Sequence, residues 1–209
     1  PEGVSLVTAA IANDTDDVML VTEGGRAIRF PTTDIRVFKS RGSTGVRGIR
    51  LAEGDTVVSM AIIRHFEAEA DERAAYLKQR RLMAGVTEDE ADDEEESVAA
   101  GQLSPERYAE MSAAEDLILT ITKGGSGKLS SSHDYPVRGR GGMGVKAMDG
   151  AMRGGPLVAS FPVDLTDQIM LATSTGQSIR VPVDQISFRS RSAGGVKVFN
   201  TGGDEEVVS

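Results

Sequence analysis

Three stretches of the chain share one pattern of apolar and polar positions. Each opens with an apolar run after an acidic residue, at Asp17, Asp116 and Asp167, and passes through a Gly turn into a second run. A polar loop and a Gly-Val-(Arg/Lys) segment follow. Short apolar runs bounded by Gly turns predict β-strands, and we interpret the three acidic residues as turn residues.

The spacing of the glycines indicates a repeat. The later Gly follows the turn Gly by 20 residues in the first stretch and by 19 in the other two. Gly176 follows Gly125 by 51 residues, whereas Gly125 follows Gly25 by 100, so about 49 residues are inserted between the first two stretches. A period near 50 with several strands per repeat is typical of propeller blades.

A fourth strand-like element ends each repeat, at residues 54–59, 155–160 and 203–209, and residues 3–7 resemble it. The sequence therefore predicts an all-β, propeller-like fold with blades of four strands each. Because the chain has no initiator Met and opens inside a blade, we expect it to be a piece of a longer protein.

The repeats divide the chain into parts of one domain. The expected parts are a first blade with the last strand of a preceding blade (1–63), an acidic, partly helical insertion (64–115), a second blade (116–163) and a third blade (164–209).

The insertion differs in kind from the blades. Residues 66–84 are rich in helix formers, and Gly85 is placed as a helix stop. The acidic run at residues 88–96 has no residue that can pack, so we expect it to be disordered. Ser104-Pro105 predicts an N-cap and first helical position, with a short helix to about residue 114.

Net charge is misleading until it is divided. The whole chain carries −9, but residues 64–116 hold 16 acidic and 6 basic residues, and the rest holds 16 acidic and 17 basic. The blades are therefore balanced in charge. The absence of Cys excludes disulfides and thiolate sites and suits a reducing cytoplasm. No apolar run is long enough to cross a membrane.

No group of residues predicts catalysis or metal binding. His133-Asp134 follows a run of serines, but adjacency in sequence does not make a triad. His65 and His133 have no partners at metal-ligand spacing.

Basic residues recur at similar places in every repeat. Strand alternation predicts that they face water opposite the apolar core positions, and the paired loop cations suit phosphate oxygens. Such a curved track of positive charge would hold bent duplex DNA by its backbone, without reading its sequence. The candidate DNA-binding residues are Arg29, Arg36, Lys39, Arg41, Arg47, Arg50, Lys123, Lys128, Arg138, Arg140, Lys146, Arg180, Arg189, Arg191 and Lys197.

The segment Ser43-Thr-Gly-Val-Arg-Gly-Ile-Arg-Leu-Ala-Glu-Gly-Asp-Thr-Val-Val-Ser59, with residues 16–20 and 167–170, resembles the C-terminal domain of bacterial DNA gyrase A. The resemblance covers the three repeats, about three quarters of the chain, and leaves out the insertion. It implies a β-pinwheel, of which these are the last three blades, whose basic rim wraps DNA.

The resemblance also implies partners and limits. It implies that the rest of gyrase A, together with gyrase B, assembles with this domain as an A2B2 heterotetramer in the bacterial cytoplasm. ATP and Mg²⁺ would bind elsewhere in that holoenzyme, and this piece would bind no cofactor and carry no catalysis of its own. The basic Gly-rich box of the family's first blade does not occur here.

Two alternatives stay open. One is the C-terminal domain of topoisomerase IV, a related and more degenerate pinwheel; the well-kept Thr44-Gly-Val-Arg-Gly-Ile-Arg50 favours gyrase. The other is a protein-interaction propeller of the WD or kelch kind, from which a chain without Trp departs.

Overall fold

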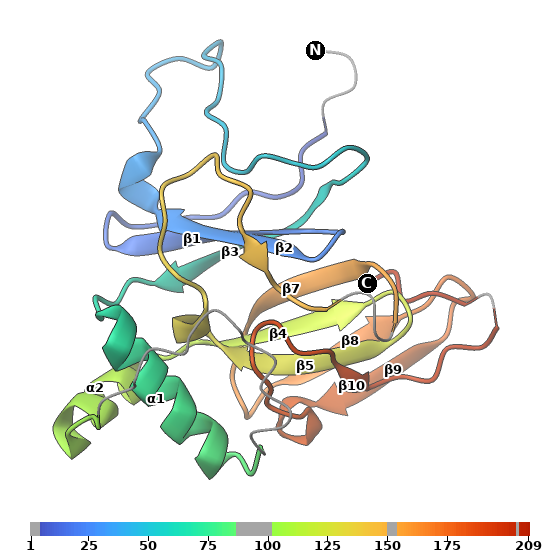
Figure 1. Ribbon diagram of the computed structural model, residues 1–209. Helices are drawn as coiled ribbons and strands as arrows, with labels where there is room; N and C mark the ends of the chain where they lie inside the picture. The colour runs from blue at the N-terminus through green and yellow to red at the C-terminus, as the bar shows by residue number, and fades with distance from the viewer. Residues whose placement is uncertain (1–4, 87–101, 150–153, 204) are drawn as a thin grey trace.

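The structure is a computed structural model that describes residues 5–86, 102–149, 154–203 and 205–209 (Figure 1). The acidic run at residues 88–96, predicted to be disordered, lies outside these residues. The strands are β1 (Asp16–Thr22), β2 (Arg26–Pro31), β3 (Val57–Arg64), β4 (Leu117–Thr122), β5 (Ser126–Ser131), β6 (Val145–Lys146), β7 (Leu157–Val163), β8 (Gln168–Ala172), β9 (Ser178–Pro182) and β10 (Val196–Lys197). The helices are α1 (Ala70–Met83) and α2 (Pro105–Ala114), with short 3₁₀ turns η1 (Thr32–Asp34), η3 (Ser132–Asp134) and η4 (Val183–Gln185).

The strands form antiparallel sheets that match the repeats. The first sheet has the order β3-β1-β2-β6, the second has the order β10-β5-β4-β7, and the third pairs β8 with β9. The prediction of an all-β fold with four-stranded blades is confirmed. Within the described residues, the three sheets do not close into a ring.

Each four-stranded sheet takes its outer strand from the next repeat. β6, from the Gly-Val-Lys segment of the second repeat, pairs with β2, and β10, from the third repeat, pairs with β5. The corresponding segment of the first repeat, residues 45–50, forms no strand, and the described residues hold no preceding sheet edge for it to join. Residues 5–7 also form no strand, and Leu6 is exposed.

The sheets stack face to face, and one apolar cluster fills each space between them. Met19 and Ile63 of the first sheet pack with Ile118 and Tyr135 of the second repeat. On the other face of the second sheet, Leu119 joins a cluster built mainly from the third repeat. Strands β4 and β5 are therefore buried on both faces.

The two predicted helices are present and lie together at one end of the second sheet (Figure 1). α1 starts four residues later than predicted, because Glu69 and Glu72 form a capping box. Gly85 ends it with φ at +71°, as a helix stop requires. Ser104 caps α2, its Oγ accepting from Arg107 N at 3.1 Å, as predicted.

The insertion returns close to where it leaves. Arg64, at the end of β3, donates its Nη2 to Asp116 Oδ1 at 2.9 Å, immediately before β4. His133 of η3 forms a hydrogen bond between its Nε2 and Met111 O of α2 at 2.7 Å, and its ring contacts Phe66 and Tyr76 edge to face. The helices are thereby fixed to the second blade and leave the blade stacking continuous.

Candidate nucleic-acid interface

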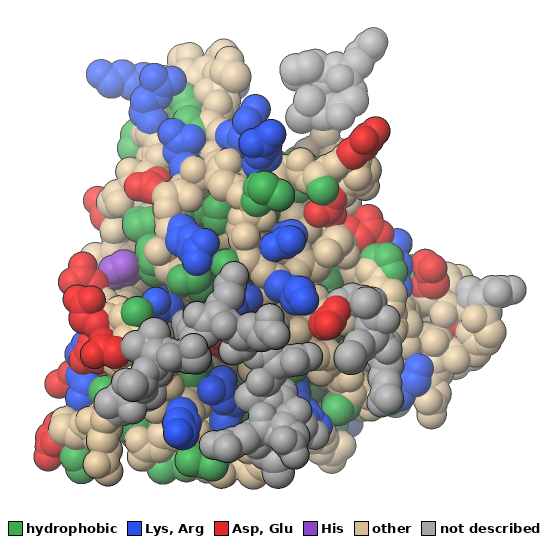
Figure 2. Space-filling view, viewed as in Figure 1, with side chains coloured by type: hydrophobic (Ala, Val, Ile, Leu, Met, Phe, Trp, Pro, Cys, Tyr) green, Lys and Arg blue, Asp and Glu red, His purple; other side chains and the backbone are tan. Residues whose placement is uncertain are grey.

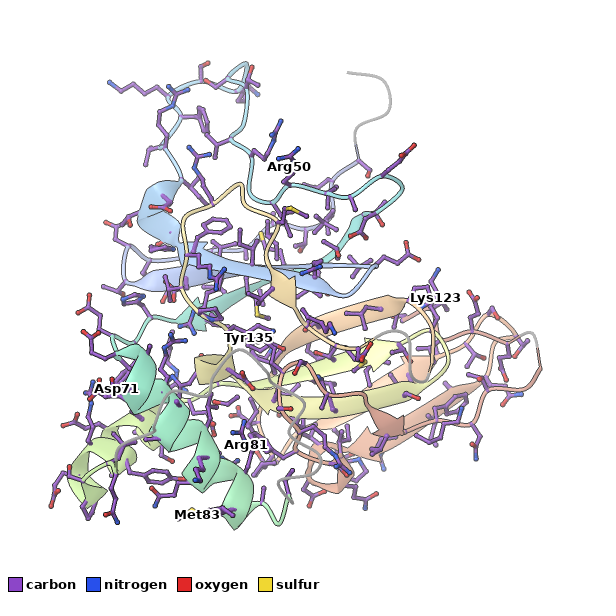
Figure 3. All side chains as sticks on the ribbon, viewed as in Figure 1. Arg50, Asp71, Arg81, Met83, Lys123 and Tyr135 are labelled. Carbon is purple, nitrogen blue, oxygen red and sulfur yellow. The ribbon has the colours of Figure 1, made fainter. Side chains whose placement is uncertain are left out.

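The long loop of the first repeat, residues 35–56, carries five of the predicted cations, and all five are exposed: Arg36, Lys39, Arg41, Arg47 and Arg50. Arg36 lies over the ring of Phe38, 4.8 Å from its centroid. Figure 2 shows Lys and Arg side chains gathered over the upper part of this face, where the loop lies, and Figure 3 labels Arg50 there. This loop is the most exposed group of cations among the predicted residues.

The second and third repeats add exposed cations on outer strands and loops. Lys146 lies on β6 and Lys197 on β10, so each belongs to the outermost strand of its sheet. Lys197 Nζ donates to Gly124 O at 3.1 Å. Arg138 and Arg140 are exposed in the second loop, and Arg180 is exposed on β9. The rim of the sheets is therefore basic in every repeat.

Sequence reasoning missed Arg26, which belongs to this rim. It is exposed at the start of β2, and the β2–β6 register places it directly opposite Lys146. Like charges across a strand pair destabilise a sheet, and a bound anion would relieve that repulsion. The signal in the sequence was the basic residue that follows Gly25 directly.

Two predicted residues are half-buried. Lys123 Nζ pairs with Glu23 Oε1 of the first repeat at 2.7 Å, and this hydrogen bond raises the pKa of Lys123. Arg189 donates its backbone N–H to Leu129 O at 2.8 Å.

Arg29 does not face water, contrary to the prediction from strand alternation. Its Nε donates to Asp17 Oδ2 at 2.7 Å, and its guanidinium also reaches Ser132 O at 2.8 Å and Arg64 O at 2.9 Å. Burial lowers the pKa of Arg29, and the charge of Asp17 opposes that shift. The alternation rule failed because the second sheet covers this face of β2, so Arg29 joins two blades.

Lys128 is also buried, contrary to the prediction. Counted from the Gly turn, it matches Ile28 rather than Arg29, and a shift of one residue moves a side chain to the other face of a strand. Its Nζ donates to the carbonyls of Ser190 at 2.9 Å, Ala193 at 2.6 Å and Arg191. All three ammonium hydrogens thus have acceptors in the third repeat's loop.

Arg191 is the third predicted cation that the structure buries. Its backbone N–H donates to Asp134 Oδ2 at 2.7 Å, and its Nε donates to Asp134 O at 2.8 Å. Its Nη1 donates to Lys146 O. The loop lies against the second blade, so this guanidinium is directed at protein carbonyls and is shielded from solvent.

The acidic residues that open the repeats also need correction. Counted from the Gly turn, Asp16 matches Asp116 and Asp167, whereas Asp17 is one residue further on. Asp16 and Asp167 are turn residues, since each accepts a hydrogen bond from the backbone N–H three residues earlier. Asp17 lies buried in β1 between Arg29 and His65, so the turn interpretation was wrong for it.

Among the residues described, no cluster of His, Cys, Asp or Glu could hold a metal ion. The helices in that same part of the chain include none that could cross a membrane. What the exposed rim offers is positive charge spaced along stacked sheet edges.

Comparison with known families agrees with this architecture. The family model described as "DNA gyrase C-terminal domain, beta-propeller" matches residues 16–64, 116–155 and 167–209. The matched ranges cover the three sheets and leave out residues 65–115. The chain belongs to the DNA gyrase C-terminal domain family, as the sequence resemblance predicted.

Curated relatives carry the name of the A polypeptide of DNA gyrase. The one from Granulibacter bethesdensis is 45% identical over 221 residues, which span all of this chain and 24% of that protein. The one from Rickettsia bellii is 38% identical over 211 residues, again across all of this chain and 23% of that protein. The chain thus spans about a quarter of these relatives. Their names favour gyrase over the topoisomerase IV alternative.

A solved structure has the same fold. A crystal structure of the C-terminal domain of DNA topoisomerase IV aligns with 94% of this chain and 46% of its own, with a TM-score of 0.64 and 19% identity. At this identity the likeness concerns the fold alone.

Proposed function

We propose that this chain binds duplex DNA along its basic rim through phosphate contacts, bends it without reading its sequence, and does so as the C-terminal part of gyrase A. The observation that carries the proposal is the recurrence of exposed Arg and Lys at the outer edge of each stacked sheet. Cations spaced along a curved edge neutralise successive phosphates and favour a bent path.

In that role the chain supplies binding and no chemistry. We infer that the rest of gyrase A and its partner gyrase B complete an A2B2 assembly in the bacterial cytoplasm. ATP and Mg²⁺ are bound there by other parts, and the wrapped DNA is presented to them for strand passage. The family membership and the gyrase A names of the relatives support this assignment.

A salt series tests the proposal directly. Binding of the chain to a labelled duplex of about 40 base pairs is measured by fluorescence anisotropy at increasing salt, for two unrelated sequences. We expect the same log–log slope for both, of several units, since each neutralised phosphate contributes about 0.9. No binding at low salt, or a strong preference for one sequence, would contradict non-specific wrapping.

Single cations then locate the path. Arg180→Ala removes an exposed charge on β9 that shares no sheet face with another blade, and we expect it to lower the slope by about 0.9 without changing stability. Asp184→Ala, an exposed acidic change in the neighbouring turn, is the matched control and should leave the slope unchanged.

A further inference from the structure

The polar loops of the three repeats carry paired cations two residues apart: Lys39 and Arg41, Arg138 and Arg140, Arg189 and Arg191. The second member always stands four residues before the later glycine of its repeat. This spacing makes Arg140 and Arg191 equivalent positions, although one is exposed and the other buried.

The two equivalent arginines make the same pair of contacts with the preceding repeat. Arg140 donates its Nε to Asp34 O at 3.0 Å and its Nη1 to Arg47 O at 3.2 Å. Arg191 donates its Nε to Asp134 O at 2.8 Å and its Nη1 to Lys146 O.

The acceptors are equivalent as well. Asp34 and Asp134 are the last residues of η1 and η3, and Arg47 and Lys146 each follow the Gly-Val of their own repeat. One guanidinium therefore joins two separate points of the preceding blade, in both blade junctions that the structure describes.

The first member of each pair is used differently. The backbone N–H of Arg138 donates to Arg29 O at 2.8 Å, and that of Arg189 donates to Leu129 O at 2.8 Å. These are again equivalent bonds, but they occupy the backbone and leave the Arg138 side chain exposed. Within one loop, Arg138 presents its charge to solvent while the guanidinium of Arg140 is engaged with carbonyls.

We propose that Arg140 and Arg191 are positioning residues that set the angle between successive blades, and thereby the curvature of the DNA bound along the rim. This inference rests on the proposed function. A guanidinium suits the task, since its fixed fork of donors reaches two carbonyls at a defined separation, whereas an ammonium offers one donor centre. Arg138 is the phosphate ligand of the same loop.

The experiment compares Arg140→Lys, Arg140→Ala and Arg138→Ala in the whole chain. A duplex of about 40 base pairs carries a fluorophore at each end, so energy transfer between the ends reports the bend, and anisotropy gives the salt slope. We expect both Arg140 variants to lower the energy transfer of saturated complexes toward that of free duplex. We expect the salt slope of Arg140→Lys to stay at the wild-type value.

Arg138→Ala is the matched control and should behave in the opposite way. We expect it to lower the salt slope by about 0.9 and to leave the energy transfer at saturation near wild type. If Arg140→Lys restores full bending, charge alone matters at that position and the positioning role is overturned. If Arg140→Lys lowers the slope as Arg138→Ala does, Arg140 is an ordinary phosphate ligand and the proposal also fails.

A measurement without DNA separates this inference from the proposed function. The chain has no Cys, so Glu53→Cys and Met170→Cys, both exposed, place one spin label on the first repeat and one on β8. We expect Arg140→Lys to broaden or shift the distance distribution between them, while Arg138→Ala leaves it unchanged. An unchanged distribution in Arg140→Lys, with the bend also unchanged, would overturn the proposal even if the chain binds DNA as expected.

Discussion

The first and third sheets place the same residue in opposite environments. Arg29 of β2 and Arg180 of β9 stand at equivalent positions after the Gly turn, yet Arg29 is 4% exposed and Arg180 lies in solvent. The first sheet is covered by the second, whereas no further sheet among the described residues covers β9. The comparison teaches that a repeated cation is a rim residue or a core residue according to what stacks on its blade.

The same lesson applies to the middle blade, one residue away. Lys128 matches Ile28 of the first repeat and Ile179 of the third, and it is fully buried under the loop of the next repeat. Ile179 is 38% exposed. Here a neighbouring loop, and not a neighbouring sheet, decides the environment.

The largest expected effect breaks the comparison at its centre. Arg29→Ala leaves Asp17 charged and buried, and we expect it to lower the free energy of unfolding by about 3–5 kcal/mol. Urea unfolding measures the loss. Arg180→Ala, the matched change in the third repeat, should stay within about 0.5 kcal/mol. Equal effects of the two substitutions would mean that stacking does not distinguish these positions.

A smaller loss is expected at Lys128. Lys128→Met keeps the stem and removes the ammonium, which leaves three buried carbonyls without their donor, and we expect a cost of about 1–3 kcal/mol. Lys197→Met is the exposed counterpart and should leave stability nearly unchanged while lowering the salt slope of DNA binding. If Lys128→Met instead weakens DNA binding and keeps stability, the buried assignment is wrong.

The smallest effect concerns pH and sharpens the comparison of the three turns. Thr33 and Asp184 are exposed, whereas His133 at the same place in η3 is buried beneath the insertion helices. Burial lowers the pKa of His133, and a hydrogen bond to Met111 O opposes this shift. The unfolded chain therefore binds the proton more readily, so stability should fall as pH decreases through the usual His pKa near 6.5.

Urea unfolding between pH 7.5 and pH 5.5 measures this dependence. His133→Gln retains an amide donor and does not titrate, so the fall should be weaker in that variant. A fall of the same size in both proteins would show that other groups cause it.

Much of the fold could be predicted from local signals. Gly turns and short apolar runs located the main strands, and Ser104 and Gly85 marked helix ends, because caps and turns act over a few residues. The outer strands could not be assigned to their sheets in this way. β6 and β10 are two residues long, and each pairs across a repeat boundary.

The candidate site was predicted less well. The loop cations around Arg50 and Arg138 are exposed, as strand and loop patterns indicate. Strand alternation was misleading at Arg29 because the rule assumes one solvated face, and a stacked blade has none. Arg191 could not be distinguished from Arg138 by sequence, since both are loop arginines beside small residues.

The sequence by itself determined the three repeats, the strand and helix positions, the balanced charge of the blades and the family. These follow from periodicity, turn chemistry and residue type, which are local properties. The tertiary structure alone decided which cations reach solvent and which hold blades together. That choice depends on the second sheet over Arg29 and the third repeat's loop over Lys128, contacts between residues about 60 to 100 positions apart in the chain.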